Sequence, residues 1–175
     1  MKVAVITRHA ITNYGSLLQA MATQRVVEGF GHTCEIIDYV RSDESYQQHE
    51  ITLLKRKTSW NNNPVKRLLY LALRQPESIL AGRRFEKFQK KYLKMTKRFS
   101  SVDELSKEKI DADVFVTGSD QVWGPVENGT YDSTYCLSFV PEGKKKISYA
   151  ASFGHTEMTA ENKEFFHKKK KGYIL

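Results

Sequence analysis

Three short clusters of polar and glycine residues draw attention because each directly follows an apolar run that could form a buried strand. They are Thr7–Ser16, Gly118–Trp123 and Ser152–His155. In open parallel α/β sheets, ligands bind outside the carboxyl ends of the strands. The three clusters therefore contain the candidate binding residues of this chain. Their hydroxyl, amide and carboxylate side chains could form hydrogen bonds with a polar ligand.

The first cluster places Asn13, Gly15 and Ser16 where a helix is expected to begin. Gly15 allows a ligand to approach the backbone closely, and the N-terminus of a helix favours anions and polar ligand oxygens. Capping is an equally open interpretation, because Asn and Thr are ordinary helix N-cap residues and Asn13 or Thr12 would serve in that role.

The second cluster, T-G-S-D-Q-V-W, contains a hydroxyl, a carboxylate and an amide at Ser119, Asp120 and Gln121. Asp120 could accept a proton or a hydrogen bond from a sugar hydroxyl, while Gln121 offers both a donor and an acceptor. Trp123 could stack on a sugar ring. The alternative is that Asp120 caps a helix and Trp123 packs in the core, as many tryptophans do. Ser152, in the third cluster, is expected to flank the same hollow.

Proton transfer has few candidates in this sequence. His9 and His155 lie near expected strand ends, although a single histidine is more often structural. Asp120 and His9 are the weak catalytic candidates. We expect no metal site, because two cysteines cannot by themselves form a four-ligand zinc site. We expect no cofactor, because phosphate-loop and dinucleotide-binding glycine patterns are absent.

Four apolar runs predict the strands that position these clusters, near residues 2–7, 33–38, 113–117 and 146–151. With amphipathic segments between them, they predict an α/β fold: a Rossmann-like, mainly parallel sheet with helices on both faces. A short strand or extended segment is expected over residues 134–140. At one sheet edge, Asn13 and Asp120 should lie within roughly 15 Å of each other.

Residues 41–100 are expected to form a helical insertion with 15 basic and five acidic residues. One short helix over residues 65–74 should end before Pro76, and a basic amphipathic helix should occupy residues 83–98. Such a helix could bind nucleic acid, but its aromatic residues fall on the apolar stripe. We therefore expect a solvated basic face and no specific nucleic-acid binding.

The composition is that of one ordinary domain: 175 residues, 40% hydrophobic, with a net charge of +8. No apolar run approaches the ~20 residues of a membrane helix, so no transmembrane segment is expected. The first ten residues do not resemble a signal peptide. Together with the low cysteine content, this predicts a cytoplasmic location.

Five ordered segments resemble the polysaccharide pyruvyl transferase family: V-A-V-I-T-R-H-A-I-T-N-Y-G-S-L-L-Q-A near the start, I-I-D-Y at 36–39, the basic segment at 85–105, V-T-G-S-D-Q-V-W at 116–123 and K-I-S-Y-A-A-S-F-G at 146–154. The resemblance implies the N-terminal lobe of a two-lobed fold like the GT-B glycosyltransferases. It also implies transfer of pyruvate from phosphoenolpyruvate to two hydroxyls of a sugar in a cell-surface polysaccharide precursor, which forms a cyclic ketal. The residues that it carries over as substrate-binding candidates, on the acceptor side of the cleft, are Asn13, Gly15, Ser119, Asp120 and Gln121. Ser152 joins them as a substrate-binding candidate from its expected place beside the same hollow.

Family members are roughly twice this length, as two lobes require. We therefore expect a truncated member: residues 1–164 as the N-terminal lobe, and residues 165–175 as a basic tail that a frameshift in the lysine run could have produced. The groups that bind phosphoenolpyruvate are expected in the second lobe, so the chain alone should be inactive unless a separate chain completes it. The alternatives are half of a GT-B-like glycosyltransferase and a non-catalytic fragment or binding module.

Overall fold

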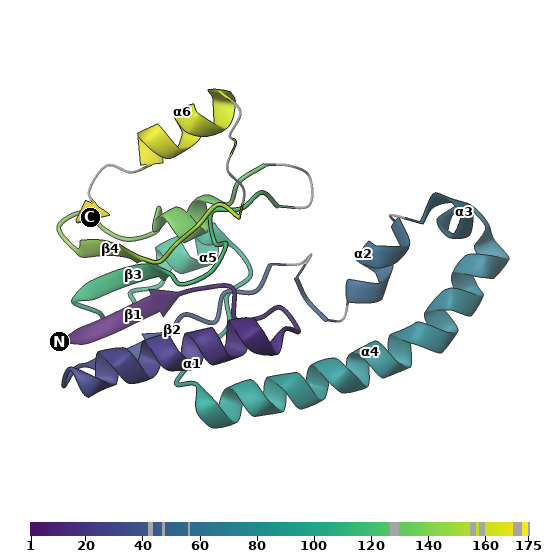
Figure 1. The fold of residues 1–175 in the computed structure, drawn as a ribbon, viewed down its shortest axis with the longest axis horizontal. Helices are drawn as coiled ribbons and strands as arrows, with labels where there is room; N and C mark the ends of the chain where they lie inside the picture. Colours follow the sequence, from purple (N-terminus) through teal and green to yellow (C-terminus); the bar gives the residue numbers. More distant parts are fainter. Residues whose placement is uncertain are drawn as a thin grey trace.

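A central parallel sheet organises the chain in the computed structural model (Figure 1). The structure describes residues 1–41, 44–46, 48–55, 57–126, 130–154, 157, 160–169 and 173–174. The sheet has five strands in the order β2-β1-β3-β4-β5, and every neighbouring pair is parallel. The strands are β1 (Lys2–Ile6), β2 (Thr33–Ile36), β3 (Val114–Gly118), β4 (Lys145–Tyr149) and β5 (Tyr173–Ile174).

The first four strands lie where the apolar runs predicted them, and the predicted α/β class is confirmed. β1 is an interior strand that pairs on both sides: Val5 is in register with Ile36 of β2 and with Val116 of β3. Parallel strands aligned in this way end at the same edge. The loops that follow β1, β3 and β4 therefore leave the sheet together.

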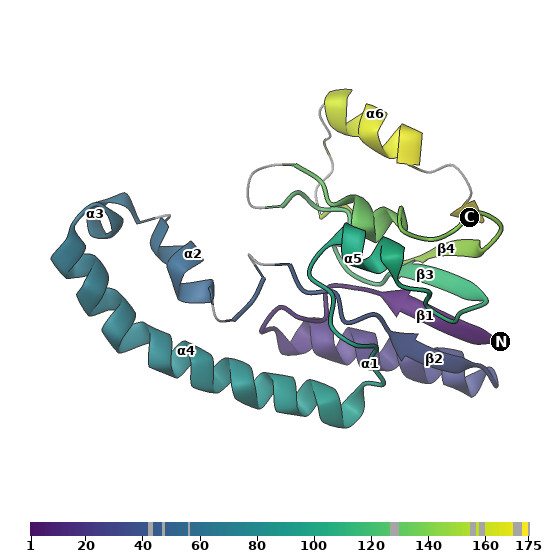
Figure 2. The same cartoon turned by 180° about the vertical axis from the view of Figure 1, so that it is seen from behind.

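Helices cover both faces of the sheet, as Figures 1 and 2 show from opposite sides. Alternate residues of β1 point to opposite faces. Val3 and Val5 pack with Leu17 of α1 (Tyr14–Gly29), whereas Ala4 and Ile6 pack in a second core. That second core includes residues of α5 (Val102–Lys107) and of the short 3-10 helix η1 (Ser133–Cys136).

Residues 41–100 contain α2 (His49–Lys55), α3 (Thr58–Asn61) and one long helix, α4 (Pro64–Tyr92). The prediction of two separate helices was wrong, because α4 continues through Pro76. Proline removes one backbone donor, but the turns on either side keep theirs, and α2 and α3 pack along α4. Whether residues 41–100 form an insertion within a lobe stays a prediction.

The predicted basic helix also ends earlier than residue 98. After Tyr92 the chain becomes extended, with Met95 bridging Ile36 and Phe99 bridging Tyr39 in parallel fashion. Ile36 N–H donates to the Lys94 carbonyl at 2.7 Å, so this segment satisfies backbone groups at the outer edge of β2. An exposed strand edge needs such a partner, and helix periodicity does not reveal it.

Residues 134–140 do not form the strand or extended segment that their apolar content suggested. They begin in η1, where the Asp132 side chain accepts from Thr134 N–H, and Leu137 adopts a left-handed conformation with φ 52°. Tyr135 and Leu137 are fully buried in this compact turn. The same apolar side chains thus enter the core without pairing in the sheet.

No helix in the described part of the chain is long and apolar enough to cross a membrane. The last described helix, α6 (Ala160–Lys169), packs Phe166 against Trp123 and Phe153, with ring centroids 6.1 and 4.7 Å apart. This contact ties the end of the chain to the loop that follows β3.

Candidate functional site

Two side-chain hydrogen bonds join the loop after β3 to the first turns of α1. The Ser16 hydroxyl donates to Asp120 Oδ2 at 3.0 Å, and Gln19 Nε2 donates to Ser119 Oγ at 2.8 Å. The pairs are 104 and 100 residues apart in the sequence. The sheet brings them together because β1 and β3 are parallel neighbours, so that α1 begins beside the turn where β3 ends.

The turn after β3 has a strained backbone. Gly118 has φ 148°, and a Cβ at this position would lie 1.9 Å from the Tyr149 carbonyl oxygen. Ser119 follows with φ 66°, a conformation that costs an L-residue about 1–2 kcal/mol, and its N–H donates to the same carbonyl at 2.6 Å. The glycine is required by this close approach, and the turn that it permits directs Asp120 toward α1.

Asn13 caps α1. Its Oδ1 accepts from Gly15 N–H at 2.8 Å, and both residues are exposed. A Cβ at residue 15 would lie 3.1 Å from that oxygen, so glycine here also permits the cap. Capping, one of the two interpretations of this cluster, is what the structure describes for Asn13, and ligand binding by Asn13 and Gly15 stays a prediction.

The third cluster lies against the second. Ser152 N–H donates to the Asp120 carbonyl at 3.0 Å, and Trp123 N–H donates to the Ser152 carbonyl at 3.1 Å. Asp120 is half-buried, and Gln121 is exposed. The side chains of Asp120, Gln121 and Ser152 thus lie at one sheet edge, where the sequence predicted them.

Trp123 belongs to the core. Its Nε1 donates to the Tyr135 carbonyl at 3.1 Å, and its ring packs against Phe153 with centroids 5.4 Å apart. Its ring also meets Phe166 of α6. These contacts favour the packing interpretation of this tryptophan over sugar stacking.

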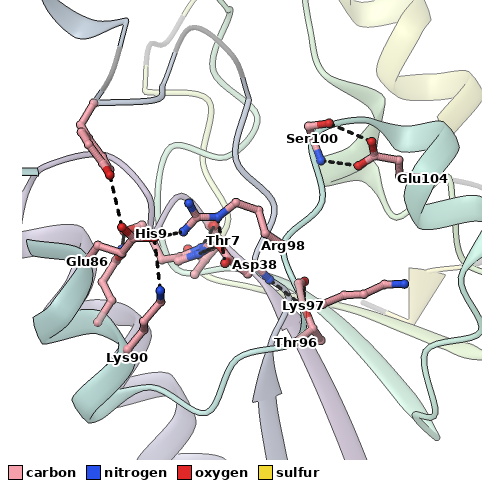
Figure 3. Close-up of polar contacts among 12 residues, drawn as sticks. Thr7, His9, Asp38, Glu86, Lys90, Thr96, Lys97, Arg98, Ser100 and Glu104 are labelled. Carbon is pink, nitrogen blue, oxygen red and sulfur yellow. Dashed lines mark hydrogen bonds and ion pairs between the residues drawn. The ribbon is translucent and has the colours of Figure 1, made fainter. Parts of the chain in front are cut away.

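His9 is fully buried, and both of its ring nitrogens have partners (Figure 3). Nδ1 lies 3.1 Å from the Thr7 carbonyl, which can only accept, and Nε2 lies 3.1 Å from Asp38 Oδ1. Asp38 Oδ2 accepts from Arg98 Nε at 3.1 Å. Burial acts to raise the pKa of Asp38, but the hydrogen bond and charge of His9 and the charge of Arg98 outweigh it and lower that pKa. Oδ1 of an ionised Asp38 can accept a hydrogen bond from Nε2.

This ion cluster fastens the loop after β1 to the middle segment. Arg98 also pairs with Glu86 of α4 at 2.9 Å, and Gln89 Nε2 donates to the His9 carbonyl. Figure 3 shows this chain of contacts, which runs from His9 to Asp38, from Asp38 to Arg98 and from Arg98 to Glu86. The buried ring of His9 suits holding this loop in place better than exchanging protons with a substrate. His155 lies outside the described residues.

Beside the joined loops is a hollow of about 580 Å³. Its charged lining residues are Arg8, Arg41, Arg74, Glu44, Glu50 and Glu77. None of the predicted site residues lines it, although Thr12 and Pro125 from the same two loops do. Among the described residues, no group of three His, Cys, Asp or Glu side chains gathers that could hold a metal ion.

Arg8 connects the hollow with the candidate site. Its Nε and Nη2 donate to Glu44 Oε1 at 3.0 and 2.7 Å, and its Nη1 lies 3.4 Å from the Gln121 carbonyl. Arg41 also approaches Glu44, at 3.4 Å, and Arg74 approaches Glu77 at 3.4 Å. Arg8 and Arg41 share Glu44, Arg74 pairs with Glu77, and Glu50 accepts from the Tyr70 hydroxyl. With three arginines and three glutamates, the lining has donors and acceptors and no net formal charge.

Sequence reasoning missed these residues, although one of them carried a usable signal. Arg8 lies just after a buried strand, where a residue at the sheet edge is expected. Arg41 and Glu44 lie in a segment without clear periodicity, and Arg74 was expected on a helix with nothing to indicate which way it faces. The packing of α2 and α4 brings them to the hollow.

Comparison with known proteins identifies the family. A sequence model of the family described as polysaccharide pyruvyl transferase matches residues 13–173, a range that includes Ser16 and Asp120. No curated protein and no solved structure matches the chain. The match spans most of the 175 residues and extends past residue 164, where the sequence resemblance was expected to end. This chain belongs to the polysaccharide pyruvyl transferase family.

Proposed function

We propose that this chain binds the acceptor sugar for a transfer of pyruvate from phosphoenolpyruvate to a polysaccharide precursor in the cytoplasm. The acceptor would lie at the carboxyl edge of the sheet, over Asp120, Gln121 and Ser152, and extend into the adjoining hollow. The observation that carries the proposal is the hydrogen bond from Ser16 to Asp120, which joins the two loops beside that hollow.

The chemistry of the hollow supports a sugar ligand. Each sugar hydroxyl both donates and accepts, and the lining offers arginine donors beside glutamate and threonine acceptors. Because Arg8 and Arg41 are already paired with Glu44, a polyphosphate would have to displace that carboxylate to bind them. A neutral polyhydroxyl compound would not.

The transfer reaction sets definite requirements. The terminal enol carbon of phosphoenolpyruvate gains a proton, the adjacent carbon forms two bonds to sugar oxygens, and its bond to phosphate oxygen breaks. The two hydroxyls lose two protons, of which one balances the new methyl group and the other leaves with phosphate. Asp120 Oδ1 accepts from Gln121 N–H at 2.7 Å and Oδ2 accepts from the Ser16 hydroxyl at 3.0 Å, but each carboxylate oxygen has a second lone pair. Because Asp120 is only half-buried, it can still take a hydroxyl proton, whereas His9 is fully buried with both ring nitrogens engaged. We assign the role of proton acceptor to Asp120.

The donor needs cations for its phosphate and carboxylate. Arg8, Arg41 and Arg74 each face a glutamate, so we place the donor clamp outside this chain, on a second lobe or a separate chain. This division also accounts for the expectation that the chain alone is inactive.

Binding to the full chain tests the proposal. Saturation-transfer NMR would use methyl hexopyranosides with free 4- and 6-hydroxyls, whose ketal is a six-membered ring, and separately phosphoenolpyruvate. We expect transfer to the hexosides and little to phosphoenolpyruvate. Asp120→Asn should weaken hexoside binding, while Asp103→Asn, on the exposed surface of α5, should not. Strong phosphoenolpyruvate binding without hexoside binding would contradict the assignment of the acceptor side.

A further inference from the structure

The N-terminal half of α4 carries an apolar face on which no described part of the protein packs. Five of its side chains are more than half exposed: Val65 (73%), Leu68 (72%), Leu69 (53%), Leu73 (67%) and Leu80 (54%). Single exposed leucines are ordinary, but a contiguous exposed patch marks an interaction site. Val65, Leu69 and Leu80 lie in one row with Ala72 and Pro76, because these residues follow one another at steps of three or four. Leu68 and Leu73 flank this row, three residues after Val65 and four after Leu69.

The same line continues along α4 as a row of cations. Arg83, Lys87 and Lys90 follow Leu80 at steps of three, four and three residues, and all are exposed. Lys90 approaches Glu86 at 3.6 Å, whereas Arg83 and Lys87 form no ion pair with any residue that the structure describes. One face of α4 is thus apolar over its first half and basic over its second.

The packing of α2 and α3 on another side of α4 explains why this face is free. α2 and α3 pack against a different side of the helix, where the Tyr70 hydroxyl donates to Glu50 at 2.9 Å and the Tyr70 ring meets Trp60 at 6.2 Å. Successive helical residues are about 100° apart, so Tyr70 points away from the row that contains Val65 and Leu69. Figures 1 and 2 show α4 as a bowed helix that leaves the sheet, with α2 and α3 on its inner side.

We propose that this face of α4 docks the protein on an anionic lipid membrane, lying in the plane of the interface. A helix with leucines on one face and with lysines and arginines nearby matches the boundary between acyl chains and charged headgroups. The cations match the phosphates of an anionic surface, and residues 41–100 carry 15 basic against five acidic residues. The inference is independent of the proposed transfer reaction.

Charge complementarity favours lipid over the other occupants. A second copy aligned along the whole of α4 would set like charges together if parallel, or would cover leucines with Arg83 and Lys87 if antiparallel. A nucleic acid would meet the cations and leave the leucines in water. An interface that is apolar in depth and anionic at its surface satisfies both halves.

Vesicle co-sedimentation of the full chain tests the proposal. We expect the chain to pellet with vesicles of phosphatidylglycerol in phosphatidylcholine, to stay in solution with phosphatidylcholine alone, and to be released as salt rises. Replacing Arg83 and Lys87 by Gln should lower the partition coefficient on the order of fivefold for each charge. Leu69→Ser with Leu73→Ser should lower it at least about tenfold.

The control is Leu18→Ser with Val26→Ser, which removes two equally exposed apolar residues from α1 and should leave partitioning unchanged. Unchanged circular dichroism and melting temperature show that each variant is folded. Three outcomes would overturn the proposal: no binding of the wild type to anionic vesicles, full binding by the leucine variant, or a dimer in solution that the leucine variant converts to a monomer. The last would identify a second copy as the occupant.

Discussion

Gly118 and Tyr149 approach so closely that a methyl group on Gly118 would lie 1.9 Å from the Tyr149 carbonyl oxygen. This contact fixes how β3 ends beside β4, and the following residue, Ser119, donates its N–H to the same oxygen. The candidate site therefore depends on one backbone position that only glycine can occupy.

Gly118→Ala should lower the free energy of unfolding by about 3 kcal/mol or more, because backbone must move and φ 148° is unfavourable for alanine. The matched control is Gly29→Ala, near the end of α1, where a Cβ meets nothing within 4 Å. That change should raise stability by about 0.5–1 kcal/mol. Urea unfolding measures both, and equal effects would contradict the role given to Gly118.

Ser16→Ala removes the hydroxyl that donates to Asp120 Oδ2. We expect a loss of about 1 kcal/mol in urea unfolding, since the bond is partly buried and ends on a carboxylate. Ser106→Ala, on the exposed surface of α5, should change stability by less than about 0.5 kcal/mol. If the two variants behave alike, the contact between the loops contributes nothing measurable to the fold.

The buried cluster around Asp38 should give an acid-dependent stability. Because the folded-state pKa of Asp38 is lowered, its contribution is complete above the ordinary pKa of aspartate, about 3.9, and is lost as the pH falls toward the folded-state pKa. Asp38→Asn should cost about 2 kcal/mol at neutral pH, because it removes the buried carboxylate that His9 and Arg98 contact and leaves Arg98 with Glu86 as its remaining carboxylate partner. The difference between wild type and variant should shrink on acidification. A constant difference from neutral pH to about pH 3 would contradict this account.

The two cysteines should be unreactive in the folded chain. Cys34 and Cys136 are both buried, and burial, assisted by the nearby Glu28, raises the pKa of the Cys34 thiol to about 11. We expect iodoacetamide to modify neither at mildly alkaline pH until urea unfolds the protein, and mass spectrometry to report both adducts together. Fast labelling of Cys34 under native conditions would show that β2 opens locally.

The chain alone should release no phosphate from phosphoenolpyruvate in the presence of the methyl hexopyranosides. The reason is that the proposed donor clamp lies elsewhere, and a transfer of this kind needs both substrates held and water excluded. A phosphate-release assay checks this. Turnover that persists through purification would place the catalytic groups within these 175 residues.

Sequence periodicity predicted the sheet because buried parallel strands are short, continuous and apolar. Val3 to Ile6 and Val114 to Thr117 needed no further information, and the sharp change to glycine and polar residues after them indicated the edge at which the candidate site lies. The helix limits failed at Pro76 and after Tyr92 because packing by α2, α3 and the edge of β2 outweighed local preference.

The amino-acid sequence by itself determined the family, the first four strands and the sheet edge at which Asp120 lies, because these depend on local patterns of residue type. Only the tertiary structure decided which side chains meet there. The pairing of Ser16 with Asp120, the burial of His9 against Asp38 and the gathering of Arg8 with Glu44 join residues 104, 29 and 36 positions apart. Such contacts arise from how β1, β2 and β3 align and how the middle segment folds back, and no local pattern encodes them.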